Sequence, residues 1–196
     1  MRKKEKHLKK NIINAALKIF AKKGFYETTV DDIAKAVGIA KGTVYLYFKD
    51  KPTLYISTID EHLVDGTKFL LEIENQNISS TEKLQKIASN WFQIMAQMKT
   101  SFPMFTFENI NLTRRLLKGL KPIIILRLTG MIKIIAKIID SGIKNNEFRK
   151  IQPKIAAVHF LNTIRTGIFA DFFTPGTSVS YNTAMKLFFV GLKKRR

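Results

Sequence analysis

The residues from Lys41 to Tyr47 combine one lysine, one glycine, one threonine and two tyrosines within about two turns of an expected helix. A lysine can donate to a guanine edge or a phosphate, and a threonine hydroxyl can do either more weakly. Tyr45 and Tyr47 carry hydroxyls on rigid arms that can reach phosphate oxygens, and Gly42 allows close approach because it has no side chain. For Tyr47 core packing is an equal alternative, and Phe48 is assigned to the core. This set of residue types predicts contact with duplex DNA.

The charge of the chain agrees with an anionic partner. It has 34 Lys and Arg residues against 15 Asp and Glu, a formal net charge of +19. Such a field attracts nucleic acid or an anionic membrane surface, and a merely solubilising basic surface is the alternative. The apolar stretch from Ile123 to Ile139 is interrupted by charged side chains, so we expect a buried amphipathic helix and not a membrane span. We expect no membrane partner.

Several kinds of chemistry find no support in the sequence. With no cysteine there are no disulfides or thiolate sites, as suits a reducing cytoplasm, and no signal peptide is visible. The three histidines have no spacing suited to a metal, and no phosphate loop, nucleophile elbow or paired carboxylates stand out. We therefore expect a cytoplasmic protein that is not an enzyme and has no metal or cofactor.

Helical periodicity dominates the chain, and its start and stop signals predict an all-α fold of about nine helices. A basic tail over residues 1–10 precedes a first helix that stops at Gly24. Thr29 and Asp32 form a capping box that opens a short helix closed by Gly38. A third short helix runs from about Lys41 to Tyr47. The later start signals are Asp50 with Pro52, Ser79 with Glu82, Ser101 with Pro103, Pro122, Pro153 and Val179; the helices from Pro103 and Pro122 should end near Gly119 and Gly142.

The two short helices, joined by a glycine turn, explain how the residues near Lys41 become available. We expect Ile33, Val37, Ile39 and Val44 to pack against Leu17 and Phe20 of the first helix. The third helix then projects from the domain, and the major groove of B-DNA, about 12 Å wide, accepts such a helix. We place a helix-turn-helix DNA-binding domain with its basic tail at residues 1–52, and a helical ligand-binding and dimerisation domain at residues 53–196.

The segment from Gly24 to Lys51 resembles the DNA-binding domain of the TetR family of bacterial regulators, through Gly24-Phe25, Thr29, Asp32-Ile33-Ala34, Gly38, Lys41-Gly42-Thr43, Tyr45, Tyr47-Phe48 and Lys51. The resemblance implies base contacts by Asp31, Lys41, Gly42 and Thr43, and phosphate contacts by Thr29, Tyr45, Tyr47 and Lys51. The chain has Ala40 where many members place serine, so we expect the third helix to lack a side-chain cap. The resemblance also implies that C-terminal helices enclose an effector pocket and pair two subunits.

One short recognition helix reads few bases, so we expect a homodimer on a palindromic operator with half-sites about 34–36 Å apart. The last two helices supply candidate interface residues: Ala156, Phe160, Ile164, Phe172, Ala184, Leu187, Phe188 and Gly191. Packing within the chain is the alternative for part of each stripe.

An adaptable apolar pocket is one interpretation of the aromatic and methionine side chains near residues 91–107, and plain core packing is the other. The candidates for the apolar lining are Trp91, Phe92, Met95, Phe102, Met104, Phe105 and Phe107. The candidates for polar contacts with a ligand are His62, Arg127, His159, Asn162 and Arg165. A buried arginine would favour an anionic effector such as a fatty acid, because an unpaired buried charge is costly.

The sequence thus predicts a DNA-binding repressor that a small, largely apolar effector releases from its operator. Within the same fold, the alternative is a DNA-binding regulator or scaffold whose pocket is filled with side chains. Outside it, the alternatives are a basic helical module that binds membranes or proteins, and an all-α enzyme.

Overall fold

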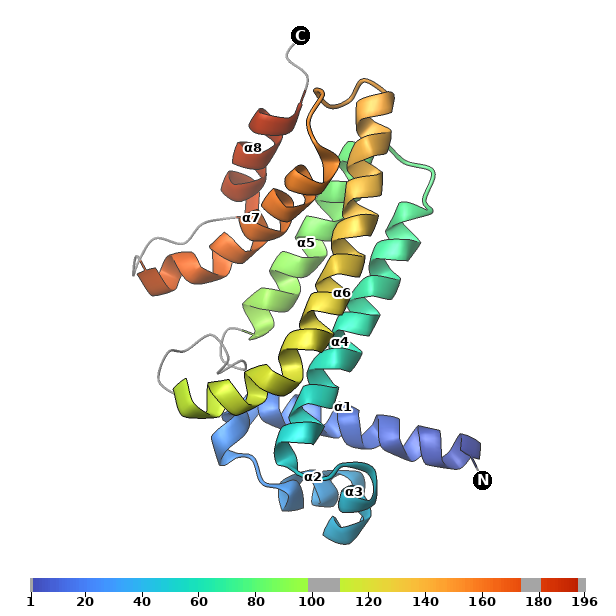
Figure 1. Ribbon diagram of the computed structural model, residues 1–196, viewed down its shortest axis with the longest axis vertical. Helices are drawn as coiled ribbons and strands as arrows, with labels where there is room; N and C mark the ends of the chain where they lie inside the picture. The colour runs from blue at the N-terminus through green and yellow to red at the C-terminus, as the bar shows by residue number, and fades with distance from the viewer. Residues whose placement is uncertain (1, 99–109, 174–180, 194–196) are drawn as a thin grey trace. The chain divides into compact units, whose positions relative to one another are not determined.

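The computed structural model describes residues 2–98, 110–173 and 181–193. These residues form eight helices, and the one β pairing among them is an isolated antiparallel bridge between Phe148 and Lys193. The helices are α1 Arg2–Glu27, α2 Val30–Val37, α3 Lys41–Tyr47, α4 Lys51–Glu74, α5 Ser80–Met98, α6 Ile110–Lys144, α7 Pro153–Phe173 and α8 Tyr181–Leu192 (Figure 1). The all-α prediction is confirmed.

Two features of the helices differ from the sequence prediction. The residues before Lys10 are helical from Arg2 onward, so the basic N-terminal segment extends α1 and is not a separate tail. The break expected between Gly119 and Pro122 does not form, and α6 continues through Pro122. A proline inside a helix removes one backbone hydrogen bond, but it does not stop the helical spacing of apolar residues on either side from continuing.

The chain divides into two compact units, Met1–Asp65 with Met98–Arg127 and Gly66–Gln97 with Leu128–Arg196. The first unit is built around three aromatic rings. Phe20 stacks on Phe25 with ring centroids 5.9 Å apart, and Tyr55 of α4 meets both rings edge-on at 5.0 Å. Gly24 lies between the two phenylalanines with φ of 77° and ψ of 172°, a conformation that breaks α1 before its last turn. This break lets Phe25 fold back beside Phe20, and glycine adopts such a backbone at low cost.

The second unit joins the start of α5 to the turn that follows α6. The Glu147 carboxylate accepts hydrogen bonds from the backbone N–H groups of Ser80 and Thr81, at 3.0 and 2.9 Å. These are free amides of the first turn of α5, so the carboxylate caps that helix from a distant part of the chain. Gly142 is needed beside this contact because a Cβ atom there would collide with the Phe148 ring.

The α7 and α8 helices pack on each other in the second unit. The rings of Phe160 and Phe188 meet edge-on with centroids 5.2 Å apart, and both side chains are buried. The other side of each helix is uncovered in the single chain: Leu187 is 71% exposed and Ile155 is 60% exposed. Each of these two helices therefore has one buried apolar face and further apolar side chains in solvent.

Candidate DNA-binding site

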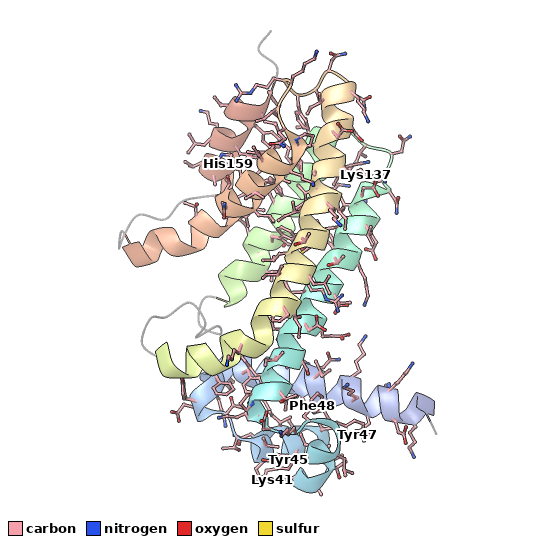
Figure 2. All side chains as sticks on the ribbon, viewed as in Figure 1. Lys41, Tyr45, Tyr47, Phe48, Lys137 and His159 are labelled. Atoms are coloured by element: carbon pink, nitrogen blue, oxygen red, sulfur yellow. The ribbon has the colours of Figure 1, made fainter. Side chains whose placement is uncertain are left out.

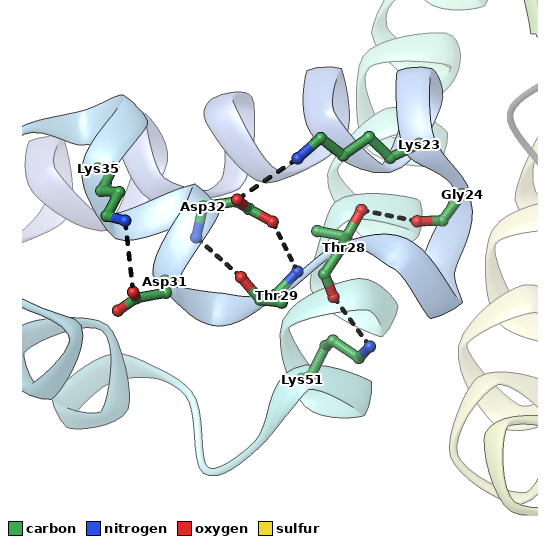
Figure 3. Close-up of polar contacts among 8 residues, drawn as sticks. All are labelled: Lys23, Gly24, Thr28, Thr29, Asp31, Asp32, Lys35 and Lys51. Carbon is green, nitrogen blue, oxygen red and sulfur yellow. Dashed lines mark hydrogen bonds and ion pairs between the residues drawn. The ribbon is translucent and has the colours of Figure 1, made fainter.

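The first short helix of the candidate site, α2, begins at a complete capping box. The Thr29 hydroxyl accepts a hydrogen bond from the Asp32 N–H at 3.1 Å, and the Asp32 carboxylate accepts one from the Thr29 N–H at 3.0 Å (Figure 3). Lys23 of α1 adds an ion pair to the same carboxylate at 3.4 Å. These contacts, the Thr29 backbone hydrogen bond first, hold the pKa of Asp32 below its usual value. The prediction of this cap from the sequence is confirmed.

The turn between α2 and α3 depends on Gly38. Its backbone is left-handed, with φ of 75° and ψ of 37°, and its N–H donates to the carbonyls of Ala34 and Lys35. The Ile39 N–H also donates to the Ala34 carbonyl at 3.0 Å. This is a glycine-terminated helix end, which reverses the chain within two residues and starts α3 at once. Ala40 at the start of α3 provides no side-chain cap, as expected.

The α3 helix has one buried side and one exposed side. Val44 and Phe48 lie in the core of the first unit with 1% and 2% of their surface exposed, and Tyr47 is half-buried against that core. Lys41 and Gly42 are exposed, and Tyr45 is 46% exposed. Figure 2 shows Lys41 and Tyr45 together on α3. A short helix thus presents a lysine, a bare backbone and a phenol to solvent.

Three other candidates for DNA contact are more buried than Lys41 and Tyr45, or already take part in a hydrogen bond or ion pair. Thr29 is exposed but its hydroxyl caps α2, and Thr43 is half-buried. Asp31 is half-buried and forms an ion pair with Lys35 one turn later, at 3.7 Å (Figure 3). This carboxylate is therefore partly neutralised beside the surface that would face an acidic duplex.

Lys51 has a structural role that the sequence did not reveal. Its ammonium group donates to the carbonyl oxygens of Phe25 and Thr28 at 2.9 Å and of Tyr26 at 3.3 Å. It also lies over the Phe25 ring, 4.5 Å from the centroid. Burial lowers the pKa of Lys51. The side chain ties the start of α4 to the carbonyls at the end of α1, so a phosphate contact by Lys51 stays a prediction that requires these hydrogen bonds to be shared.

The basic N-terminal part of α1 also approaches this region. The Lys9 ammonium lies 5.6 Å from the centroid of the Phe48 ring, next to the end of α3, and Lys10 forms an ion pair with Glu61 of α4 at 3.9 Å. Lys4 and Lys6 are exposed. The N-terminal half of α1 therefore adds positively charged lysines to the unit that contains α3.

The residues proposed for the effector pocket fall into three groups. Trp91 and Phe92 are half-buried, and the Phe92 ring meets Tyr181 edge-on at 5.3 Å, so they remain candidates. Met95, Phe102, Met104, Phe105, Phe107 and Arg165 have side chains outside the described set. The rest are polar residues with other surroundings: His62, Arg127, His159 and Asn162.

Three of the four described polar candidates are paired or exposed. Arg127 donates through Nε to the Asp60 carboxylate at 2.8 Å, and the side chain is 35% exposed, so it is not the unpaired buried charge that would favour an anionic ligand. His159 and Asn162 are exposed on α7. His62 is half-buried, and burial lowers its pKa.

The candidate interface residues also separate by burial. Five of the eight are at most 3% exposed inside the single chain: Ala156, Phe160, Ile164, Ala184 and Phe188. These side chains pack within the protomer, as the alternative interpretation held. Leu187 and Gly191 are exposed on α8, and Phe172 lies outside the described side chains. The sequence did not single out Ile155, Val158 and Val190, which are 60%, 43% and 66% exposed on the same two helices.

Comparison with known proteins agrees with this geometry. Residues 12–58 match the family of bacterial regulatory proteins known as the tetR family. The chain is 29% identical to the fatty acid metabolism regulator protein of Bacillus subtilis over 143 residues, which cover 71% of this chain and 70% of that protein. It is 33% identical over 72 residues to the negative transcriptional regulator of the biofilm operon icaADBC of Staphylococcus epidermidis, covering 37% of this chain and 39% of that protein.

The fold has a solved counterpart over nearly its whole length. The crystal structure of the transcriptional regulator FadR from Bacillus subtilis in complex with stearoyl-CoA has a TM-score of 0.71 at 25% sequence identity, covering 92% of this chain and 97% of that chain. None of the described helices is both long and apolar enough to traverse a bilayer. By the match of residues 12–58 and these relatives, the chain is a DNA-binding transcriptional regulator whose N-terminal segment is similar to the tetR family of bacterial regulatory proteins.

Proposed function

We propose that the exposed side of α3 reads the operator, with Lys41, Gly42 and Thr43 at base edges and Tyr45 at a phosphate. The observation that carries this proposal is the division of α3 into a buried side and an exposed side. Because Val44 and Phe48 hold the helix against the core, its exposed groups are fixed in direction before any DNA arrives. Groups held in place lose little entropy on binding.

We propose further DNA contacts by three residues near the exposed side of α3. Thr29 and Tyr47 are proposed as phosphate contacts, and Asp31 as a base contact. The exposed Thr29 side chain stands at the start of α2, where the positive end of the helix dipole favours an anion. Asp31 would accept a hydrogen bond from the amino group of cytosine or adenine, since a carboxylate repels phosphate.

Selection of bound duplexes from random DNA tests this function. We expect a palindrome with half-sites about one helical turn apart, since a dimer presents two copies of α3. Lys41→Ala should weaken operator binding by about 1–3 kcal/mol and relax the preference at one position per half-site. Lys154→Ala removes an exposed lysine of α7 and is the matched control. Equal affinity of the wild type for all duplexes would refute the proposal.

Tyr45→Phe separates a phosphate contact from packing. It removes one hydroxyl from a side chain that is 46% exposed, so the fold should be unaffected. Binding to operator and to random DNA should fall together, because phosphate contacts carry no sequence information. A loss confined to the operator would place Tyr45 at a base edge.

We propose that the dimer forms through the uncovered side chains of α7 and α8, namely Ile155, Val158, Leu187 and Val190, together with Gly191. Each of the four apolar side chains is 43–71% exposed in the single chain. Large apolar groups gathered on two neighbouring helices mark an interface. Gly191 has open space where a Cβ would stand, so a partner helix can approach closely there.

For the effector we propose a long-chain acyl compound, such as a fatty acyl-CoA. The support comes from the relatives: one is a fatty acid metabolism regulator, and a structure 25% identical holds stearoyl-CoA. Release of labelled operator by stearoyl-CoA, but not by free coenzyme A, is the expected result. Because Arg127 is paired with Asp60, Arg127→Gln should leave the response in place.

Other outcomes of the release experiment identify the alternatives. DNA binding that no acyl compound, aromatic compound or organic cation alters would indicate a regulator whose interior is filled with side chains. Binding to acidic liposomes as tight as binding to the operator would indicate a membrane module. We place the activity in the cytoplasm and assign it no catalytic step, since the named relatives are regulators.

A further inference from the structure

Leu46 lies on the recognition helix, and at 83% exposure it is the most exposed large apolar side chain among the residues described. One leucine in solvent is ordinary for a protein surface, so its exposure alone indicates nothing. Its position does, because the exposed side of α3 is the surface that meets DNA.

The helical repeat places Leu46 within that surface. Residues four apart lie on the same side of a helix, so Lys41 and Tyr45 form one edge of the exposed side. Gly42 and Leu46 form the adjacent edge. Val44 is buried on the side opposite Gly42 and Leu46, and Phe48, which directly follows the helix, is buried as well. The exposed side of α3 is therefore polar along one edge and apolar along the other.

Gly42 has no packing reason to be a glycine. A Cβ atom built on it would meet nothing within 4 Å, and its φ is not in the left-handed region. Side chains on a helix lean toward its N-terminus, so Leu46 leans over the turn that contains Gly42. The apolar edge is thus a leucine side chain beside a bare stretch of backbone.

We propose that Leu46, leaning over Gly42, recognises the C5-methyl group of a thymine in the operator and is a specificity-determining residue. The proposal rests on the proposed function of α3. The base edges in the major groove offer hydrogen-bond donors and acceptors, and their one apolar group is the thymine methyl. Leu46 has no donor or acceptor, so it can bind neither a phosphate nor the polar edge of a base.

Deoxyuridine differs from thymidine only by that methyl group, and it provides the test. Once the operator has been selected, each thymine is replaced by deoxyuridine symmetrically in both half-sites, and the dissociation constant is measured. At one position per half-site we expect affinity to fall about fifteenfold, about fourfold for each buried methyl. The Leu46→Ala dimer should bind the intact operator more weakly and be indifferent to deoxyuridine at that position.

Leu71→Ala is the matched control, because Leu71 is a 45%-exposed leucine that belongs to α4 and not to α3. It should keep the full deoxyuridine effect. The inference is overturned if no deoxyuridine weakens the wild type, or if Leu46→Ala loses as much as the wild type at every position. A wild type with no preferred operator refutes the proposed function as well, whereas a preferred operator without a methyl effect refutes this inference alone.

Discussion

Gly42→Ala should make the protein more stable and a weaker operator binder. The glycine lies in the first turn of α3, and the open space around it shows that the fold accepts a methyl group there. The proposed DNA contact does not accept one, because the helix backbone at Gly42 is the part that comes nearest to the bases. Stability and function should therefore change in opposite directions.

The two effects can be sized separately. Alanine is favoured over glycine in a helix by about 0.5–1 kcal/mol, and no contact in the structure opposes this gain. At the DNA surface, a methyl group inserted into a close contact costs about 1–3 kcal/mol. Taking the lower limit at both half-sites gives about 2 kcal/mol, or about a thirtyfold higher Kd for the dimer.

Chemical unfolding and operator titration on the same samples provide the assay. Gly130→Ala is the control: it is also a helical glycine with nothing within 4 Å of its Cβ position, but it lies on α6. It should gain similar stability and keep wild-type affinity. If Gly42→Ala binds the operator as the wild type does, α3 does not approach the bases at Gly42, and the proposed docking is refuted.

Three further predictions concern the supports of this surface and the dimer. Lys51→Gln should lower the free energy of unfolding by about 1–2 kcal/mol, since it removes a charged donor from three carbonyls. The control Lys49→Gln changes an exposed lysine and should alter the free energy of unfolding little. Equal losses in the two variants would contradict the role given to Lys51. Asp32→Asn should weaken the α2 cap. The folded pKa of Asp32 lies below its usual value of 3.8. The cap therefore contributes to the free energy of unfolding above pH 3.8, and this contribution is lost as the pH falls through the folded pKa. Acid unfolding curves should therefore be shallower for Asp32→Asn than for the wild type, and parallel curves would refute the linkage. Val190→Glu, at a side chain 66% exposed in the single chain, should shift the molar mass measured by light scattering from dimer toward monomer; an unchanged dimer would move the interface elsewhere.

The local elements of the DNA-binding unit could be predicted because their signals lie within a few residues of each other. The Thr29–Asp32 box, the left-handed Gly38 and the uncapped start of α3 each follow from local backbone chemistry, and the structure contains all three. The same local signals predicted less well where one helix ends and the next begins. Pro122 indicated a helix start, yet α6 passes through it, because a helix can lose one hydrogen bond without ending.

The side of each helix that faces the core was harder to predict. On α7 and α8 the sequence shows apolar stripes, but a stripe that packs inside the chain and one that meets a second subunit have the same spacing. In the structure Phe160 and Phe188 are buried within the chain, whereas Leu187 and Val190 are exposed and are therefore the residues we propose for the interface. The same limit applies to Leu46, which sequence patterning does not distinguish from a core leucine.

The sequence by itself determined the all-α class, the helix-turn-helix and the resemblance of the DNA-binding segment to the tetR family, since these depend on residue types at fixed short spacings. Only the tertiary structure decided how individual charges are used. Lys51 donates to the carbonyls of Phe25, Tyr26 and Thr28, which lie 23 to 26 residues earlier in the chain, and Arg127 donates to Asp60 at a separation of 67 residues. A charged side chain binds whichever opposite group folding brings within hydrogen-bond distance, and sequence spacing does not contain that information.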